Sequence, residues 1–137
     1  MNIRLRGARI AVAATALGAA ALAIASTAPA ASADITSVSV SSGLGIGGAG
    51  VYGTGCQYTV TATVNSDDSV YFYDNLTGFL GMATSPAYGT AQVSWTPVGP
   101  GVHTLSAVQF SYWGVASRNI QVQVAPGLNF GSVCLAL

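Results

Sequence analysis

Few side chains in this sequence offer acid–base chemistry. His103 is the only histidine among 137 residues, and the chain contains no lysine and no glutamate. Nucleophilic catalysis needs a base that lies beside a nucleophile and an orienting acid. No other side chain offers a base near neutral pH, so general acid–base catalysis would depend on pairs of aspartates. We therefore expect a non-enzymatic protein without catalytic residues.

Three aspartates flank one short strand candidate and raise the question of a calcium site. Asp67 and Asp68 precede Val70–Tyr73, and Asp74 follows it. Calcium takes six to eight oxygen ligands, but a fully extended strand would hold Asp74 about 20 Å from the other two. We therefore interpret the three carboxylates as turn residues and expect no metal and no other cofactor.

The two cysteines, Cys56 and Cys134, predict one disulfide. Their spacing excludes a Cys-x-x-Cys redox motif and their number excludes a zinc site, and an even pair in an exported protein most simply forms a disulfide. The bond would close a loop of about 79 residues. We expect it to tie the C-terminal tail to the start of the strand near Tyr58, rather than to bridge two sheets through the core.

Four aromatic residues are candidates for a binding surface. Tyr112 and Trp113 fall in a turn between two strand candidates, and Tyr71 and Tyr73 take the outward phase of a strand. Exposed aromatic rings stack on sugars or fill pockets of a partner. We therefore expect contacts at Tyr112 and Trp113 first, and at Tyr71 and Tyr73 second. The alternative is that Trp113 folds back over the end of the fold.

The first 33 residues have the pattern of a secretory signal peptide. Basic residues come first, an alanine-rich apolar run follows at Ile10–Ala25, and Ala31-Ser32-Ala33 matches a small-residue cleavage site. The apolar run is too short and too rich in alanine for a transmembrane anchor. We therefore expect a secreted, extracellular protein whose mature chain begins at Asp34.

Removal of the signal changes the charge and excludes two classes of partner. Residues 34–137 contain one arginine, Arg118, no lysine and four aspartates. With histidine counted as neutral, the net charge of this part of the chain is −3. A nucleic-acid phosphate backbone needs several Lys or Arg side chains for affinity. We therefore expect no nucleic-acid partner and no membrane association after signal cleavage.

Period-two alternation of apolar and polar residues predicts strands along the mature chain. In this alternation Phe72 and Trp95 take inward positions and are expected in the core. The frequent turns favour an all-β sandwich, and no helix is expected. The predicted strands are Ile35–Ser42, Gln57–Val64, Val70–Tyr73, Phe79–Thr84, Ala91–Trp95, His103–Ala107 and Val115–Val124.

The central part of the chain resembles a known domain family. The stretches V-Y-F-Y-D (70–74), Gly81 and W-T-P-x-x-x-G-x-H-T-L (95–105) are similar to the bacterial immunoglobulin-like repeat domain, over roughly Ser37 to Val124. The resemblance implies an immunoglobulin-like β-sandwich of about seven antiparallel strands within residues 34–137. Such domains can carry a corner tyrosine near the position of His103, so we expect His103 to have a structural role there. Two departures are the single copy and the C-terminal tail.

The resemblance implies a secreted non-enzymatic module with a binding, structural or adhesion role, whose partner is an extracellular protein or glycan. The alternative is a carrier of an apolar small molecule, similar to the secreted chromoprotein apoproteins of actinobacteria, although the second disulfide usual in those proteins is absent. A cavity of more than a few hundred Å³ would favour the carrier, and an exposed apolar patch would favour partner binding.

Overall fold

Short strands with alternating apolar residues make up the protein. The computed structural model describes residues 35–41, 44–45, 50–85, 89–112 and 114–137, so the expected signal peptide and Trp113 lie outside the described residues. No described residue is helical, and none lies in a helix that could span a membrane. The strands are β1 (Ile35–Val40), β2 (Leu44–Gly45), β3 (Val51–Gly53), β4 (Tyr58–Val64), β5 (Val70–Asp74), β6 (Gly78–Ala83), β7 (Thr90–Trp95), β8 (Gly101–Ser111), β9 (Gly114–Ala125), β10 (Gly127–Asn129) and β11 (Cys134–Ala136).

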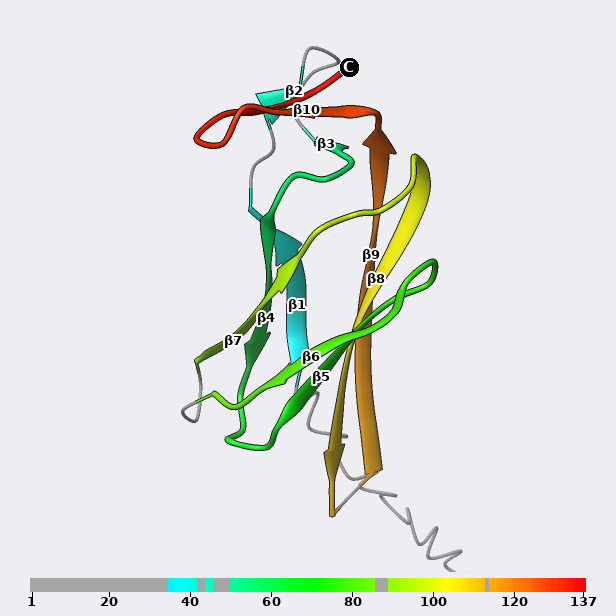
Figure 1. Ribbon diagram of the computed structural model, residues 1–137. Helices are drawn as coiled ribbons and strands as arrows, with labels where there is room; N and C mark the ends of the chain where they lie inside the picture. The colour runs from blue at the N-terminus through cyan, green and yellow to red at the C-terminus, as the bar shows by residue number, and fades with distance from the viewer. Residues whose placement is uncertain (1–34, 42–43, 46–49, 86–88, 113) are drawn as a thin grey trace, which may run out of the picture. The chain divides into compact units, whose positions relative to one another are not determined.

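Two sheets form the sandwich. One has three antiparallel strands in the order β1-β4-β7, and the other has five strands in the order β3-β9-β8-β5-β6. A small third sheet, β10-β11-β2, joins the C-terminal segment to an early part of the chain (Figure 1). The all-β sandwich predicted from the sequence is confirmed. The seven predicted strands pair antiparallel with one another, as expected. Two further pairs, β3 with β9 and β2 with β11, are parallel.

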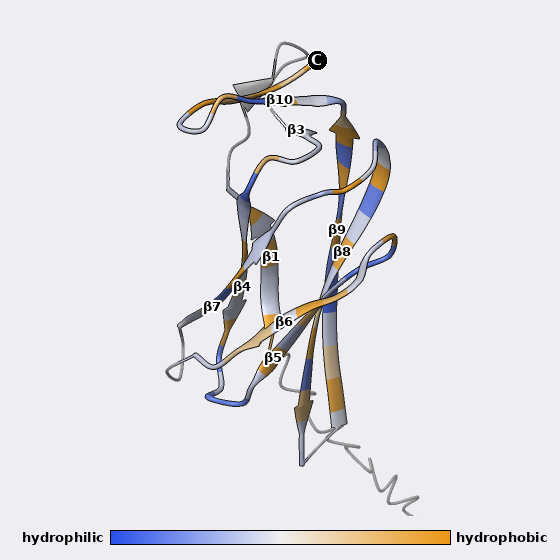
Figure 2. Cartoon of the chain, in the orientation of Figure 1, coloured by the Kyte–Doolittle hydropathy of each residue, from blue (hydrophilic) through white to orange (hydrophobic). Residues whose placement is uncertain are grey.

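Alternation along the strands puts the apolar side chains between the two sheets. In β4 the inward residues are buried and the threonines between them are more exposed. Along β9, hydrophobic and hydrophilic residues alternate (Figure 2). Phe72 and Trp95 are fully buried, as predicted. Tyr52, Tyr58 and Trp95 pack their rings edge to face or at a tilt, with centroids 4.8 to 5.8 Å apart. These aromatic contacts close one end of the core.

The seven predicted strands are present, but β2, β3, β10 and β11 were not predicted. Each has only two or three residues, too few for an alternating pattern to be recognised. Long-range contacts hold them instead. Thr54 N donates to the carbonyl oxygen of Ala125 (2.9 Å), which extends the parallel pairing of β3 with β9.

The C-terminal hairpin β10–β11 lies at the end of the sandwich where β4 begins and β9 ends (Figure 1). The Cys56–Cys134 disulfide attaches it there, with the two Cα atoms 5.7 Å apart. Cys56 precedes β4 and Cys134 begins β11, so the bond ties the tail to the start of the Tyr58 strand, as expected. The hairpin can approach this closely because residue 127 is a glycine. A Cβ atom there would lie 2.8 Å from the backbone nitrogen of Thr54.

Candidate functional site

The outer face of the five-stranded sheet carries a cluster of large apolar side chains. Tyr71 pairs across the sheet with Met82, and Tyr73 pairs with Phe79. The ring of Phe110, on the neighbouring strand β8, contacts the ring of Tyr71. We call this cluster the aromatic face; its members are Tyr71, Tyr73, Phe79, Met82 and Phe110.

The rings of the aromatic face form two pairs. The centroids of Tyr71 and Phe110 are 5.5 Å apart with the ring planes at 72°, and those of Tyr73 and Phe79 are 5.4 Å apart at 56°. Phe79 and Phe110 are 58% and 54% exposed, and Tyr73 is 37% exposed, while Tyr71 is half-buried. The outward orientation predicted for Tyr71 and Tyr73 is therefore confirmed.

Polar, uncharged side chains continue this outer face across β8 and β9. Tyr73 pairs with Ser106, and Ser106 pairs with Asn119, so the three side chains form one row across the sheet. A parallel row contains Thr104 and Gln121. Arg118 pairs with Ala107, which is buried between the sheets, so Arg118 does not belong to the outer face. Among the described residues of β5, β6, β8 and β9, the outer face therefore has no charged side chain.

The turn that was the first candidate for binding lies at the end of the β8–β9 hairpin. Tyr112 follows β8 directly and is 93% exposed. Its neighbour Trp113 is outside the described residues. Phe79, Met82 and Phe110 were not among the predicted site residues. For Phe110 a signal was present, because it continues the outward phase of Thr104 and Ser106 along the same strand.

The opposite outer face, on the three-stranded sheet, has a different composition. Cross-strand neighbours there pair hydroxyls with hydroxyls or amides, as in Ser39 with Thr61 and Thr61 with Gln92. Gln92 Nε2 donates to Thr61 Oγ1 (3.3 Å). We call this the hydroxyl face; its members are Ser37, Ser39, Thr59, Thr61, Thr63, Thr90, Gln92 and Ser94.

His103 has a buried, structural environment. It is 0% exposed, and its Nδ1 donates to Asp74 Oδ2 (2.8 Å) while its Nε2 lies 2.8 Å from the carbonyl oxygen of Gly99. Both ring nitrogens are therefore within hydrogen-bond distance of an oxygen of the protein. The bond to Gly99, four residues upstream, is the corner contact expected from the resemblance.

Asp74 is the centre of this buried network. It begins a turn at the end of β5, as predicted, but it is 1% exposed, which the sequence did not indicate. Its oxygens accept hydrogen bonds from Leu76 N, Thr77 Oγ1, Trp95 Nε1 and His103 Nδ1, at 2.8 to 3.1 Å. Burial alone would raise the pKa of Asp74, but these bonds, with His103 the strongest, lower it below its usual value.

The three carboxylates weighed for calcium do not converge. Asp74, at the end of β5, is hydrogen-bonded to His103. Asp67 and Asp68 precede the start of the same strand. Within the described ranges there is also no group of three or more His, Cys, Asp or Glu residues that could hold a metal ion.

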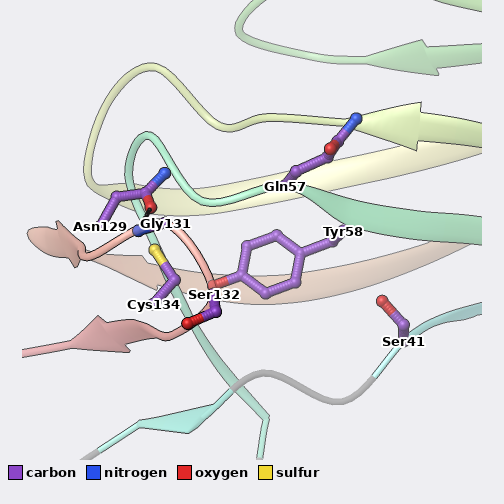
Figure 3. Close-up of a pocket in the computed structure, with 7 residues that line it drawn as sticks. All are labelled: Ser41, Gln57, Tyr58, Asn129, Gly131, Ser132 and Cys134. Carbon is purple, nitrogen blue, oxygen red and sulfur yellow. Dashed lines mark hydrogen bonds between the residues drawn. The ribbon is translucent and has the colours of Figure 1, made fainter.

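A hollow of about 350 Å³ lies beside the disulfide. Figure 3 shows its lining of hydroxyl and amide groups around the ring of Tyr58. The residues are Ser41, Gln57, Tyr58, Asn129, Gly131, Ser132 and Cys134. A site for an apolar molecule needs predominantly hydrophobic walls, so the size of this hollow meets the criterion for the carrier alternative but its chemistry does not.

No protein-family model matches the chain, and no curated protein matches it. Among solved structures, the chain is similar to the CARDB domain of a Pyrococcus furiosus protein, which was crystallised in complex with di-metal ions. The match has 18% sequence identity and a TM-score of 0.41, and covers 67% of this chain and 88% of that one.

Proposed function

We propose that this protein is a secreted, non-enzymatic, immunoglobulin-like module that binds an extracellular partner through the aromatic face. The observation that carries the proposal is the difference between the two outer faces of the sandwich. One exposes rings of Tyr and Phe, and the other is made of Ser, Thr and Gln.

The hydroxyl face shows that this fold does not need aromatic side chains on an outer surface. Contiguous apolar patches on a secreted domain favour aggregation unless a partner covers them. Phe79, Met82 and Phe110 are each more than half exposed. Exposed rings such as those of Phe79 and Phe110 are usual anchors of protein and carbohydrate interfaces, which supports a binding role for this face.

The environment of His103 supports the non-enzymatic part of the proposal. Both ring nitrogens are engaged and the side chain is fully buried. A general base must come within hydrogen-bond reach of the proton that it abstracts. His103 has no free position for a substrate atom.

Export rests on the signal-peptide pattern, which includes Ala31-Ser32-Ala33, and the disulfide is compatible with it. The intact mass of the protein from culture supernatant is expected to correspond to a chain that begins at Asp34. A mass that retains residues 1–33 would instead indicate a membrane-anchored protein.

The binding role is tested with two matched double variants of residues 34–137. Tyr73→Ser/Phe79→Ser removes one ring pair from the aromatic face, and Thr61→Ala/Gln92→Ala changes a half-buried and an exposed residue of the hydroxyl face. Each labelled domain is incubated with washed cells and cell-envelope fragments of the source organism, and the bound fraction is measured. We expect the aromatic-face variant to lose binding while its melting temperature stays near that of the control. Equal retention of the two variants would exclude the aromatic face as the binding surface.

A further inference from the structure

We infer that the partner of the aromatic face is an uncharged polysaccharide; this inference rests on the proposed function. The charge of the face gives the first argument. The described outer residues of β5, β6, β8 and β9 include no Lys, Arg, Asp or Glu, and the one cation of residues 34–137, Arg118, is on the other side of β9. A protein partner of ordinary composition brings charged side chains that this face cannot pair.

Acidic polymers are disfavoured for the same reason. Binding of a carboxylated, sulfated or phosphorylated polymer draws its affinity from Lys and Arg contacts. The net charge of −3 after residue 33 adds repulsion. The partner that complements a neutral face is therefore itself neutral.

The ring geometry gives the second argument. Because the planes within the two ring pairs are inclined at 72° and 56°, at most one ring of each pair can lie flat against a ligand. Tyr71 and Tyr73 are two residues apart on β5, so the two pairs are spaced by about 7 Å along the strand. Two stacking positions in a line suit the apolar C–H faces of successive sugar rings in one chain.

The polar row beside the rings gives the third argument. Asn119 and Gln121 are exposed on β9, and within the described part of the chain no hydrogen bond engages either side-chain amide. An amide both donates and accepts, and so does a sugar hydroxyl. Ser106 lies between Tyr73 and Asn119 in the same row. A sugar chain stacked on the rings would thus have neutral donors and acceptors along its side.

The experiment measures depletion of residues 34–137 from solution by insoluble polysaccharides. The neutral probes are cellulose, chitin and an insoluble α-glucan, and the acidic probe is polygalacturonate gel. We expect at least one neutral polysaccharide to bind the domain equally well in low and high salt. Tyr73→Ser/Phe79→Ser should weaken that binding about tenfold or more. Asn119→Ala/Gln121→Ala should weaken it to a smaller extent, and Thr61→Ala/Gln92→Ala should leave it unchanged.

The outcomes separate this inference from the proposed function. If no neutral polysaccharide binds, but the aromatic-face variant still loses binding to cells, the polysaccharide inference fails and the binding role stands. Binding to polygalacturonate alone, weakened by salt, overturns the inference in the same way. If a polysaccharide binds the aromatic-face variant as well as the unchanged domain, the polysaccharide inference fails; the proposed function fails as well only if the variant also keeps its binding to cells.

Discussion

His103 Nδ1 and Asp74 Oδ2 are 2.8 Å apart, and both side chains are fully buried although 29 residues separate them in the chain. The pair connects the end of β5 to the start of β8, and Trp95 adds a third connection from the end of β7. The only histidine of the protein therefore holds three strands of both sheets together.

We predict that His103→Ala destabilises the domain strongly. Removal of one partner leaves the carboxylate of Asp74 buried without its main donor, which costs about 3 to 5 kcal/mol in comparable buried pairs. Urea denaturation of His103→Ala, Asp74→Asn and the double variant measures the coupling. We expect the double variant to lose much less than the sum of the two single losses; strict additivity would show that the two side chains do not act as a pair.

Stability should decline in acid because of Asp74. The pKa of Asp74 is lowered in the folded protein, whereas an aspartate in the unfolded chain has a pKa of about 3.9. The carboxylate thus stabilises the fold fully above that value, and its contribution is lost as the pH falls through the lowered folded pKa. Asp74→Asn should be less stable than the unchanged domain at neutral pH and show a flatter decline below about pH 4. Asp67→Asn serves as the control, and a decline equally flat in both variants would argue against Asp74 as the source.

Loss of the disulfide should lower stability and release the C-terminal hairpin. The bond joins residues 78 positions apart, and the chain-entropy model assigns a loop of this size up to about 4.5 kcal/mol. Cys56→Ser/Cys134→Ser should therefore unfold at lower urea concentration, and limited proteolysis should cut first near β10 and β11. Reduction of the unchanged domain should reproduce both effects. An unchanged cleavage pattern would mean that Gly127 and the strand pairing hold the hairpin without the bond.

Gly127→Ala tests the close crossing of β10 over the segment between β3 and β4. The added Cβ would overlap the carbonyl oxygen of Thr54 and lie 2.8 Å from the carbonyl carbon of Gly53. Backbone atoms cannot move aside as a flexible side chain can, so we expect a loss of about 1 to 3 kcal/mol. Gly99→Ala is the matched control, because a Cβ there would meet nothing within 4 Å. Similar melting temperatures for the two variants would contradict the crossing.

Alternation was sufficient to predict every strand of the two main sheets except β3. Val60, Ala62 and Val64 recur every second residue and are all buried in β4, so the physical cause of the strand is visible in the sequence. The same rule placed Tyr71 and Tyr73 outward. It could not show that Phe79 and Phe110 come next to them, because cross-strand register depends on turns and on a bulge in the β5–β6 pairing.

The burial of Asp74 could not be predicted, because a carboxylate after a strand and before Asn75 is the usual pattern of a solvated turn. Its four donors come from three separate parts of the chain. Each donor is ordinary in its own local sequence. Only the folded arrangement brings the indole of Trp95 and the imidazole of His103 to the same oxygen atom.

The parallel pairing of β3 with β9 limits the order in which the chain can fold. A hairpin such as β8–β9 closes a short loop and can form early, whereas Val51 meets Gln123 only when the strands between them are in place. Cys56 lies just after β3 and reaches Cys134 through the same late contacts. We therefore expect the Cys56–Cys134 disulfide to form only after the strands have paired. The bond then stabilises an arrangement that the chain has already reached. The rate of folding should consequently be the same in the cysteine-free chain.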